Sequence, residues 1–267
     1  MSWIWAALMP HPPIIVPDVG KGRESDAVVT INGVGAIMKR LEGAKTPDRM
    51  LLVSPHQPYS PGALSLNGAR VIRGSFAQFG APSLVFDLRT PIPEMESVSE
   101  HLRDGGVTVR FSDLHDLTRD QGSLVPLYFL EDHFNGLPPT ILASPIGLSP
   151  TDAYEAGRVL SAFDDGHTWA LLASGDLSHR LKPDAPAGYS PEGEIFDRAV
   201  VEALEKGDAS ILSGLPRRTL EGAGECGLRS VMMMLGFCGA IGGPIDVISY
   251  EGPYGVGYCN ALWTPTH

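Results

Sequence analysis

Short apolar segments alternate with amphipathic helical segments along nearly the whole chain. This alternation is typical of layered α/β proteins, in which helices cover both faces of a sheet. We therefore predict a three-layer α/β/α fold with a central mixed, largely parallel sheet, built as one domain over residues 1–267. The predicted strands are residues 4–9, 50–53, 84–88, 107–111, 140–145, 168–173, 245–250 and 256–263, with a hairpin over residues 64–72 and Asn67-Gly68 at its tip.

Helix boundaries follow from capping residues. Ser25 or Asp26 caps a predicted helix that ends near Gly43, and Ser149 or Thr151 starts another. Ser190 as N-cap, Pro191 in the first turn and Gly207 beyond the end delimit a third helix. The remaining predicted helices are residues 94–103, a short apolar helix entered through a turn within residues 119–127, and the apolar residues 228–237.

Composition narrows the possible functions. A formal net charge of −11 argues against a general nucleic-acid binder, which needs clustered lysine and arginine. Three cysteines without CxxC spacing argue against a disulfide framework or a structural zinc site. The N-terminus lacks a basic stretch, and no apolar run is long enough to cross a bilayer, so we expect a cytoplasmic protein acting on a small molecule. The sequence leaves the oligomeric state open, and a homodimer is one of the alternatives.

Three histidines stand at equivalent places in the pattern. His11, His56 and His179 each follow a strand that should be central and parallel, and the carboxyl ends of such strands meet at one edge. Each histidine alone also fits a structural role. Glu225 lies where the last long helix begins, where it either offsets the helix dipole or binds a metal. Two imidazoles and one carboxylate form the usual non-haem Fe(II) site, and zinc accepts the same ligands.

Five motifs in order resemble those of the class III extradiol ring-cleavage dioxygenases, in the catalytic-subunit (LigB-type) superfamily that also contains Memo-type proteins. The resemblance covers residues 4 to about 263. The motifs are His11-Pro-Pro-Ile-Ile-Val-Pro, Ser54-Pro-His56, Ser174-Gly-Asp-Leu-Ser-His179-Arg, Glu225-Cys-Gly and Ser249-Tyr-Glu-Gly-Pro-Tyr-Gly-Val-Gly-Tyr258.

The resemblance implies a reaction and roles for particular residues. His11, His56 and Glu225 would bind Fe(II), with zinc or copper as alternatives, and His179 would act as the nearby acid and base. A small catecholic substrate and O₂ would meet at the metal, and the ring would open beside its two hydroxyls. Gln121 and Tyr59 are the predicted substrate contacts.

The chain departs from the family pattern at two positions, and a third is ambiguous. Gln121 and Leu228 stand where relatives have histidines, and neither side chain can carry a proton at neutral pH. In the Memo branch a cysteine joins the two histidines, so Cys226 is an alternative to Glu225 that would favour copper or zinc. The sequence therefore leaves three functions open: an extradiol dioxygenase, a Memo-like metal-binding protein without ring cleavage that serves a redox or partner-binding role, and a zinc-dependent hydrolase.

Overall fold

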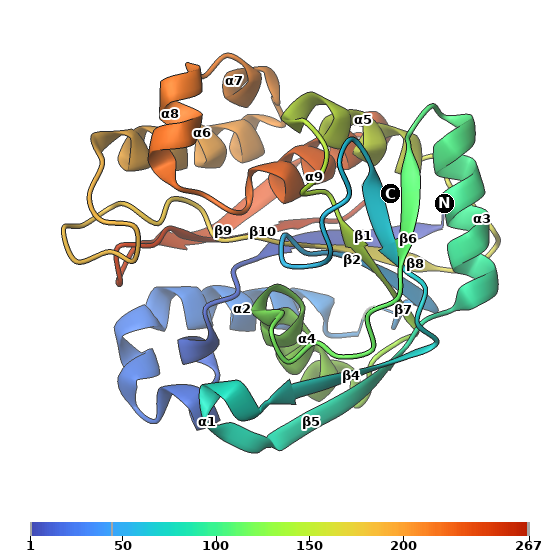
Figure 1. The fold of residues 1–267 in the computed structure, drawn as a ribbon, viewed down its shortest axis with the longest axis horizontal. Coiled ribbons are helices and arrows are strands. Elements are labelled where there is room, and N and C mark those ends of the chain that lie inside the picture. Colours follow the sequence, from blue (N-terminus) through green and yellow to red (C-terminus); the bar gives the residue numbers. More distant parts are fainter. Residues whose placement is uncertain (1, 44, 266–267) are drawn as a thin grey trace.

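The computed structural model describes residues 2–43 and 45–265, and its centre is an eight-stranded sheet (Figure 1). The strands lie in the order β6-β3-β7-β2-β8-β1-β10-β9. Their bounds are β1 Trp3–Met9, β2 Arg49–Val53, β3 Leu64–Asn67, β6 Val109–Ser112, β7 Thr140–Ser144, β8 Trp169–Ser174, β9 Ile245–Glu251 and β10 Tyr258–Trp263. β7, β2, β8 and β1 are mutually parallel neighbours, whereas β10 and β9 run antiparallel at one side. The prediction of a mixed, largely parallel sheet is confirmed.

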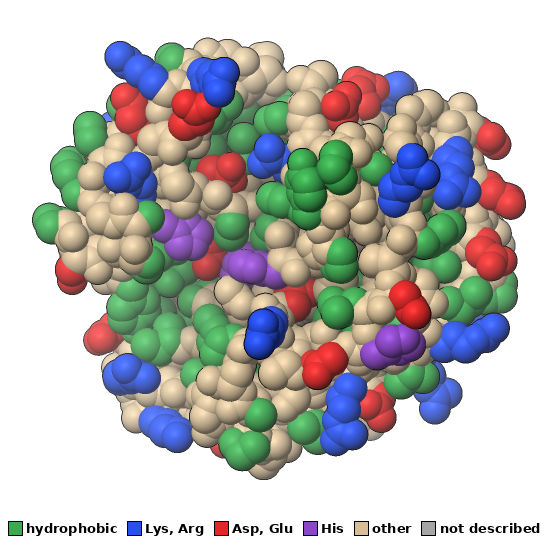
Figure 2. Space-filling model, in the orientation of Figure 1, with side chains coloured by type: hydrophobic (Ala, Val, Ile, Leu, Met, Phe, Trp, Pro, Cys, Tyr) green, Lys and Arg blue, Asp and Glu red, His purple; other side chains and the backbone are tan. Residues whose placement is uncertain are grey.

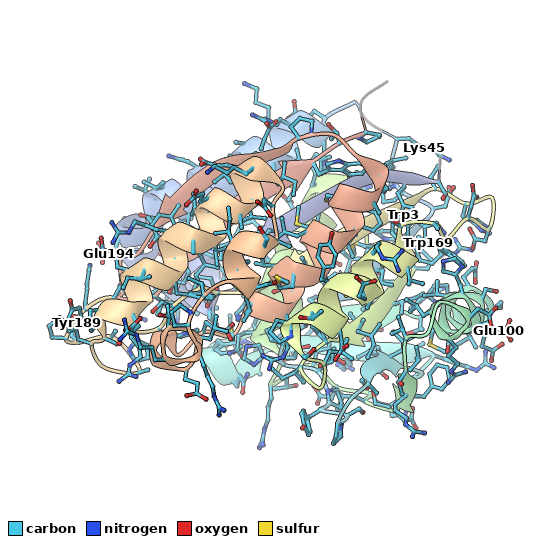
Figure 3. All side chains as sticks on the ribbon, turned by 90° about the horizontal axis from the view of Figure 1, so that it is seen from above. Trp3, Lys45, Glu100, Trp169, Tyr189 and Glu194 are labelled. Atoms are coloured by element: carbon cyan, nitrogen blue, oxygen red, sulfur yellow. The ribbon has the colours of Figure 1, made fainter. Side chains whose placement is uncertain are left out.

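Central strands are apolar on both faces because helices cover both. In β1, Trp3, Ala6 and Leu8 enter one core, whereas Trp5, Ala7 and Met9 enter the other. Trp3 packs beside Trp169 of the neighbouring β8 (Figure 3). Their ring centroids are 5.6 Å apart. This burial on both faces explains why these strands are continuous apolar runs.

Each face of the sheet has its own layer (Figure 1). One layer contains α3 Ile92–Asp104, α5 Pro150–Leu160, α6 Pro191–Lys206, α7 Ser210–Ser213, α8 Arg217–Ala223 and α9 Leu228–Ile241. The other contains α1 Pro17–Gly20, α2 Val28–Leu41 and α4 Gln121–Phe134, beside a two-stranded sheet of β4 Val71–Phe76 and β5 Ala81–Arg89. Short 3₁₀ segments cover Pro13–Ile15, Arg23–Ala27 and Ala77–Phe79. The three-layer architecture is therefore confirmed.

The predicted hairpin over residues 64–72 is wrong. β3 belongs to the central sheet, where it pairs with β6 and β7, and β4 pairs with β5 in the small sheet. The Gly68 N–H donates to the Ser112 carbonyl at 2.8 Å, and the Asn67 amide donates to the Leu114 carbonyl at 2.8 Å. The Asn-Gly pair thus extends the contact with β6 instead of closing a two-strand turn.

Helix ends agree in part with the predicted caps. Ser149 and Ser190 are N-caps, and Gly207 ends α6 in the left-handed region with φ of 63°. Ser25 and Asp26 do not cap α2, because they lie in a 3₁₀ segment and the N-cap is Ala27. Instead, the Glu251 carboxylate reaches across from β9 and accepts the Thr30 N–H at 2.6 Å. A long-range contact has replaced the local cap.

In the described part of the chain, no helix combines the length and apolar character that crossing a bilayer requires.

Candidate metal centre

The candidate site lies at the carboxyl ends of three adjacent parallel strands. β2, β8 and β1 are neighbours in the sheet (Figure 1). The loops after these strands carry His56, His179 and His11, respectively. The Nε2 atoms of His11 and His56 are 3.2 Å apart, although 45 residues separate them. The predicted meeting of these two histidines is therefore observed.

His11 is held by groups at the end of β8 and in the loop that follows it. Its backbone N–H donates to Asp176 Oδ1 at 2.8 Å, and its Nδ1 is hydrogen-bonded to Ser174 Oγ at 2.9 Å. The side chain is buried, with 2% of its surface exposed. Because Nδ1 is engaged, Nε2 is the nitrogen that faces His56 and is free to bind a metal.

The loop that carries His56 is fixed by the buried carboxylate of Asp120. This carboxylate caps α4 through the Ser123 N–H at 2.9 Å, and it also accepts hydrogen bonds from Ser54 Oγ at 2.9 Å and from the Gln57 amide. Gly122 lets α4 approach closely, because a Cβ there would lie 2.9 Å from the His56 ring. The start of α4 and the loop after β2 thus form one rigid unit.

Cys226 lies near the histidines because the loop before α9 crosses the loop after β8 where Gly227 meets Gly175. A Cβ on Gly227 would lie 2.7 Å from the Asp176 carbonyl, and the Gly227 N–H donates to that carbonyl at 2.9 Å. The crossing places Cys226 Sγ 3.6 Å from His11 Nε2. Donor atoms of His11, His56 and Cys226 all lie within 4.8 Å of one another.

Glu225, the carboxylate assigned as a ligand from the sequence, points elsewhere. Its Oε2 accepts the Leu228 N–H at 2.6 Å, at the N-terminus of α9. Among the described residues, the cluster of candidate metal ligands contains Cys226 and not Glu225. The geometry therefore favours the cysteine alternative, and the carboxylate has the helix-capping role instead.

Burial favours the uncharged forms of His11 and Cys226. Burial, reinforced by His56, holds the pKa of His11 well below its usual value, and burial raises the pKa of Asp176 to about 6. Burial, with the nearby Asp176 carboxylate, also raises the pKa of the Cys226 thiol. A cation that displaced the thiol proton would find the neutral His11 imidazole already suited to bind it. This donor set fits a transition metal.

Asp176 is a site residue to which the sequence assigned no role. Its Oδ2 lies 3.7 Å from His11 Nε2, so the carboxyl group stands at the edge of the cluster. The available signal was its place in the turn directly after β8, two residues beyond Ser174. A residue just past the carboxyl end of a central parallel strand is expected near a binding site, whatever its type.

The other predicted residues have different environments. His179 lies close enough that its charge would lower the pKa of both His11 and Asp176, and its Nδ1 is buried without a partner among the described residues. Gln121 is half-buried as the first residue of α4. Tyr59 is 65% exposed and does not line the cavity that adjoins His56. Its contact with a substrate therefore stays a prediction.

A cavity of about 490 Å³ adjoins the cluster at His56. It is lined by His56, Pro58, Leu114, Asp116, Thr118, Arg119 and Asp120. Figure 2 shows histidine side chains in a hollow near the middle of this face. A metal held by His56 would therefore be accessible to a small molecule in the cavity.

The chain is similar to known proteins in sequence and in fold. The family model described as the catalytic LigB subunit of aromatic ring-opening dioxygenase matches residues 5–259. Protein CA_C1420 of Clostridium acetobutylicum is 34% identical over 261 residues. The match covers 94% of this chain but 55% of that protein, so the chain spans about half the length of this relative.

Among solved structures, the uncharacterized protein JW3007 from Escherichia coli K12 has the same fold. It superposes with a TM-score of 0.64 at 15% sequence identity, over 97% of this chain and 99% of that one.

Proposed function

Because the chain belongs to the family of the catalytic LigB subunit of aromatic ring-opening dioxygenases, we propose that it is a metal-dependent enzyme that opens the ring of a small catecholic substrate with O₂. The observation that carries the proposal is the meeting of His11, His56 and Cys226 donors beside a cavity of substrate size. In this proposal Cys226, and not Glu225, is the third ligand.

The donor types restrict the metal. Imidazole is a ligand for iron, copper and zinc, whereas thiolate favours copper and zinc over Mg²⁺ or Ca²⁺. When bound, a redox-active ion would supply acidity to the substrate hydroxyl and a route for electrons from ring to O₂. We propose Fe(II) as the ion for ring opening, with zinc or copper as the alternatives that Cys226 favours.

Residues of the chain itself would orient the substrate and move protons. Ser174 binds Nδ1 of His11 and Asp176 accepts the His11 backbone N–H, so that Nε2 is left to face the metal position. His179 would accept a phenolic proton and return it, which is the usual role of an imidazole in acid–base catalysis. Gln121 would donate a hydrogen bond to a substrate oxygen.

A second candidate is a metal-binding protein of the Memo type without ring cleavage. Cys226 in the cluster favours it, and so does Leu228, which is buried in the core at the start of α9 and cannot carry a proton. Both candidates would bind a metal at the same site, but only the first would convert a catechol to a ring-fission product.

Metal loading followed by substrate exposure tests both candidates. The metal-free protein is loaded without oxygen with Fe(II), Zn²⁺ or Cu²⁺, and bound metal per chain is measured by elemental analysis. O₂ and a panel of catechols are then added to each form, and the absorbance of the coloured ring-fission product is followed. We expect product with the Fe(II) form, and strongly reduced product in His179→Ala.

The matched control is His115→Ala, since the His115 side chain is 67% exposed and pairs with Asp113. This variant should retain activity. One bound metal with no catechol consumed would support the second candidate, and a zinc form that hydrolyses esters would support a hydrolase. Absence of metal binding in all three forms would overturn the proposed function.

A further inference from the structure

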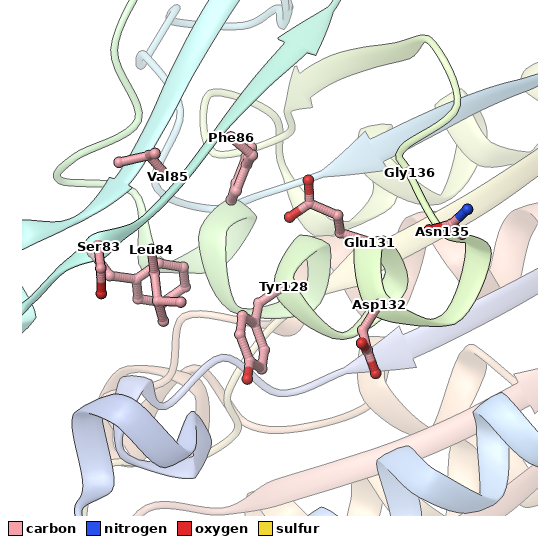
Figure 4. A pocket seen from close by; sticks show the side chains of 10 residues that line it. Ser83, Leu84, Val85, Phe86, Tyr128, Glu131, Asp132, Asn135 and Gly136 are labelled. Atoms are coloured by element: carbon pink, nitrogen blue, oxygen red, sulfur yellow. The ribbon is translucent and has the colours of Figure 1, made fainter.

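A second cavity lies away from the metal centre, between β5 and the C-terminal half of α4 (Figure 4). At about 470 Å³ it has the size of pockets that bind small molecules, and it shares no lining residue with the cavity beside His56. Gly122 of α4 lies against His56, whereas Glu131, which lines the second cavity, lies further along the same helix. At a rise of about 1.5 Å per residue, about 14 Å of helix separates the two places.

Aromatic rings form much of the wall of the cavity between β5 and α4. Phe76 at the end of β4 and Phe86 of β5 line it together with Tyr128 of α4. The Phe76 and Tyr128 rings are T-shaped, with centroids 6.0 Å apart. Phe86 packs over Gly74 of β4, where any Cβ would overlap its ring. Phe76 and Phe86 are buried, so Tyr128 offers the most accessible ring. The face of an aromatic ring attracts a cation and also packs against hydrocarbon.

Two carboxylates of the cavity have no partner in the described protein. Across residues 2–43 and 45–265, neither the Glu131 nor the Asp132 carboxylate forms an ion pair or a hydrogen bond. Among these residues no lysine or arginine lines the cavity, and Lys21, which lies beside Gly80, is outside the lining. Burial raises the pKa of Glu131, because its carboxylate has lost part of its hydration. The negative charge of the cavity is therefore available to a ligand.

The end of α4 adds to this negative potential. Asn135 and Gly136, which follow the last turn of the helix, line the cavity, and a helix C-terminus carries a negative partial charge. Burial, with the nearby carboxylates of Asp18 and Asp132, raises the pKa of the Tyr128 hydroxyl. Carboxylates from two helices, α1 and α4, thus lie near Tyr128. A positive charge placed beside this ring would be stabilised.

We propose that the cavity between β5 and α4 binds a small organic cation, either a quaternary or a protonated amine. Its charged nitrogen would lie beside Glu131 and the Tyr128 ring, and its carbon substituents would pack against Leu84 and Phe86. A metal ion fits this cavity less well, because Glu131 and Asp132 are consecutive helix residues whose side chains do not face each other. This binding requires neither the metal centre nor the proposed function.

Equilibrium binding of choline and of its carba analogue, in which a neutral carbon replaces the ammonium nitrogen, tests the inference. The two compounds have the same shape, so the ratio of their dissociation constants reports the charge. Both constants are measured by calorimetric titration on the full chain at low ionic strength. We expect choline to bind about tenfold more tightly, and this preference to shrink at high salt. Glu131→Gln should reduce it to about threefold, the part that cation–π attraction alone provides.

A pair of variants tests the Tyr128 ring. Tyr128→Phe keeps the aromatic face and should keep the preference for choline, whereas Tyr128→Leu removes the face and should lower the preference about threefold. The readout is the ratio of the two dissociation constants, because a change in packing alone would affect both compounds. If Tyr128→Leu does not fold, Glu131→Gln, which preserves the shape of the side chain, decides the test alone.

The matched control for the charge is Glu100→Gln, at an exposed position on α3 in the opposite layer. It should keep the wild-type preference for choline. Equal affinities of the wild type for choline and its carba analogue would overturn the inference, and so would an unchanged preference in Glu131→Gln. An equal loss of preference in Glu100→Gln and Glu131→Gln would also overturn it, since the effect would then come from the net charge of the protein.

His11→Ala separates this inference from the proposed function. The metal-free wild type and this variant should both show the Glu131-dependent preference for choline. If the preference disappears with the metal site, choline binds at the metal centre and the inference is refuted. If no catechol is opened but the preference depends on Glu131, the amine site stands and the proposed function alone fails.

Discussion

Cys226 and Glu225 are adjacent in the chain but serve different parts of the structure. The thiol faces His11, and the carboxylate accepts the Leu228 N–H at the start of α9. The two residues can therefore be separated by substitution. A substitution of Cys226 should weaken metal binding, and a substitution of Glu225 should destabilise α9.

We expect Cys226→Ser to weaken metal binding by more than about tenfold, because a hydroxyl is a poorer ligand than a thiolate for copper or zinc. Glu225→Gln should retain the metal and lower the free energy of unfolding by about 0.3–1 kcal/mol, through loss of negative charge at the helix N-terminus. Competition with a chelator measures the first effect, and urea denaturation measures the second. The reverse pattern would make Glu225 the ligand.

The histidines of the site could be predicted from the sequence, whereas its third donor could not be chosen. His11 and His56 follow adjacent parallel strands, and that topology alone brings them to one edge. Choosing between Glu225 and Cys226 requires the path of the backbone at Gly175 and Gly227, where the loops touch. Sequence spacing carries no information on which of two neighbours faces inward in a loop.

At the scale of elements, the crossing of the loops after β8 and before α9 positions Cys226. A Cβ on Gly227 would lie 2.7 Å from the Asp176 carbonyl and 3.0 Å from Gly175 Cα, so both contacts are with backbone. We expect Gly227→Ala to force the loops apart, to cost about 1–3 kcal/mol of unfolding free energy, and to weaken metal binding.

Gly239→Ala in α9 is the control, because its added Cβ would meet only the Tyr154 hydroxyl, at 3.9 Å. It should stabilise the protein by up to about 1 kcal/mol, as alanine does in a helix. Thermal unfolding and metal titration of both variants check the pair. Equal metal affinity in Gly227→Ala and wild type would show that the crossing does not position the cysteine.

Asp197 joins α6 to the loop that carries His179. Its buried carboxyl group accepts the Ser178 N–H at 2.8 Å and the Tyr250 hydroxyl at 2.7 Å. Burial raises its pKa from 3.8 to about 7. The folded protein then holds this proton more tightly than the unfolded chain does, so the stability it contributes in acid is lost as the pH rises from about 4 to about 7.

We expect wild-type unfolding free energy to fall more between pH 5 and pH 8 than that of Asp197→Asn, by an amount on the order of a few kcal/mol. Urea denaturation at the two pH values measures this difference. Asp104→Asn, at an exposed position on α3, should follow the wild type. Parallel changes in wild type and Asp197→Asn would contradict the assignment.

Most strands and helices could be predicted from periodicity, and two of the exceptions have the same cause. Residues 64–72 carry a strong hairpin signal, yet Asn67 and Gly68 are satisfied by β6 and the residues after it, more than 40 positions away. Ser25 likewise loses its capping role to Glu251. In both cases a partner distant in sequence has replaced a local one. The short α7 and α8 were not predicted at all, since each is brief.

At the scale of the whole molecule, metal binding and folding should be coupled, because residues separated by up to 215 positions form the site only in the folded chain. We expect saturating metal to raise the unfolding free energy by about 2.7 kcal/mol at a free metal concentration 100 times the dissociation constant. A chelator should reverse this gain, and His11→Ala should abolish it. A metal-independent melting temperature in the wild type would contradict the coupling.

The position of β1 between β8 and β10 has a consequence for synthesis. The first strand leaves the ribosome carrying Trp3 and Trp5, but both of its partners are encoded in the last 100 residues. At translation speeds of about 5–20 residues per second, these tryptophans wait for seconds to tens of seconds without their strand neighbours. The interval before β10 appears is therefore when the nascent chain most needs protection from aggregation.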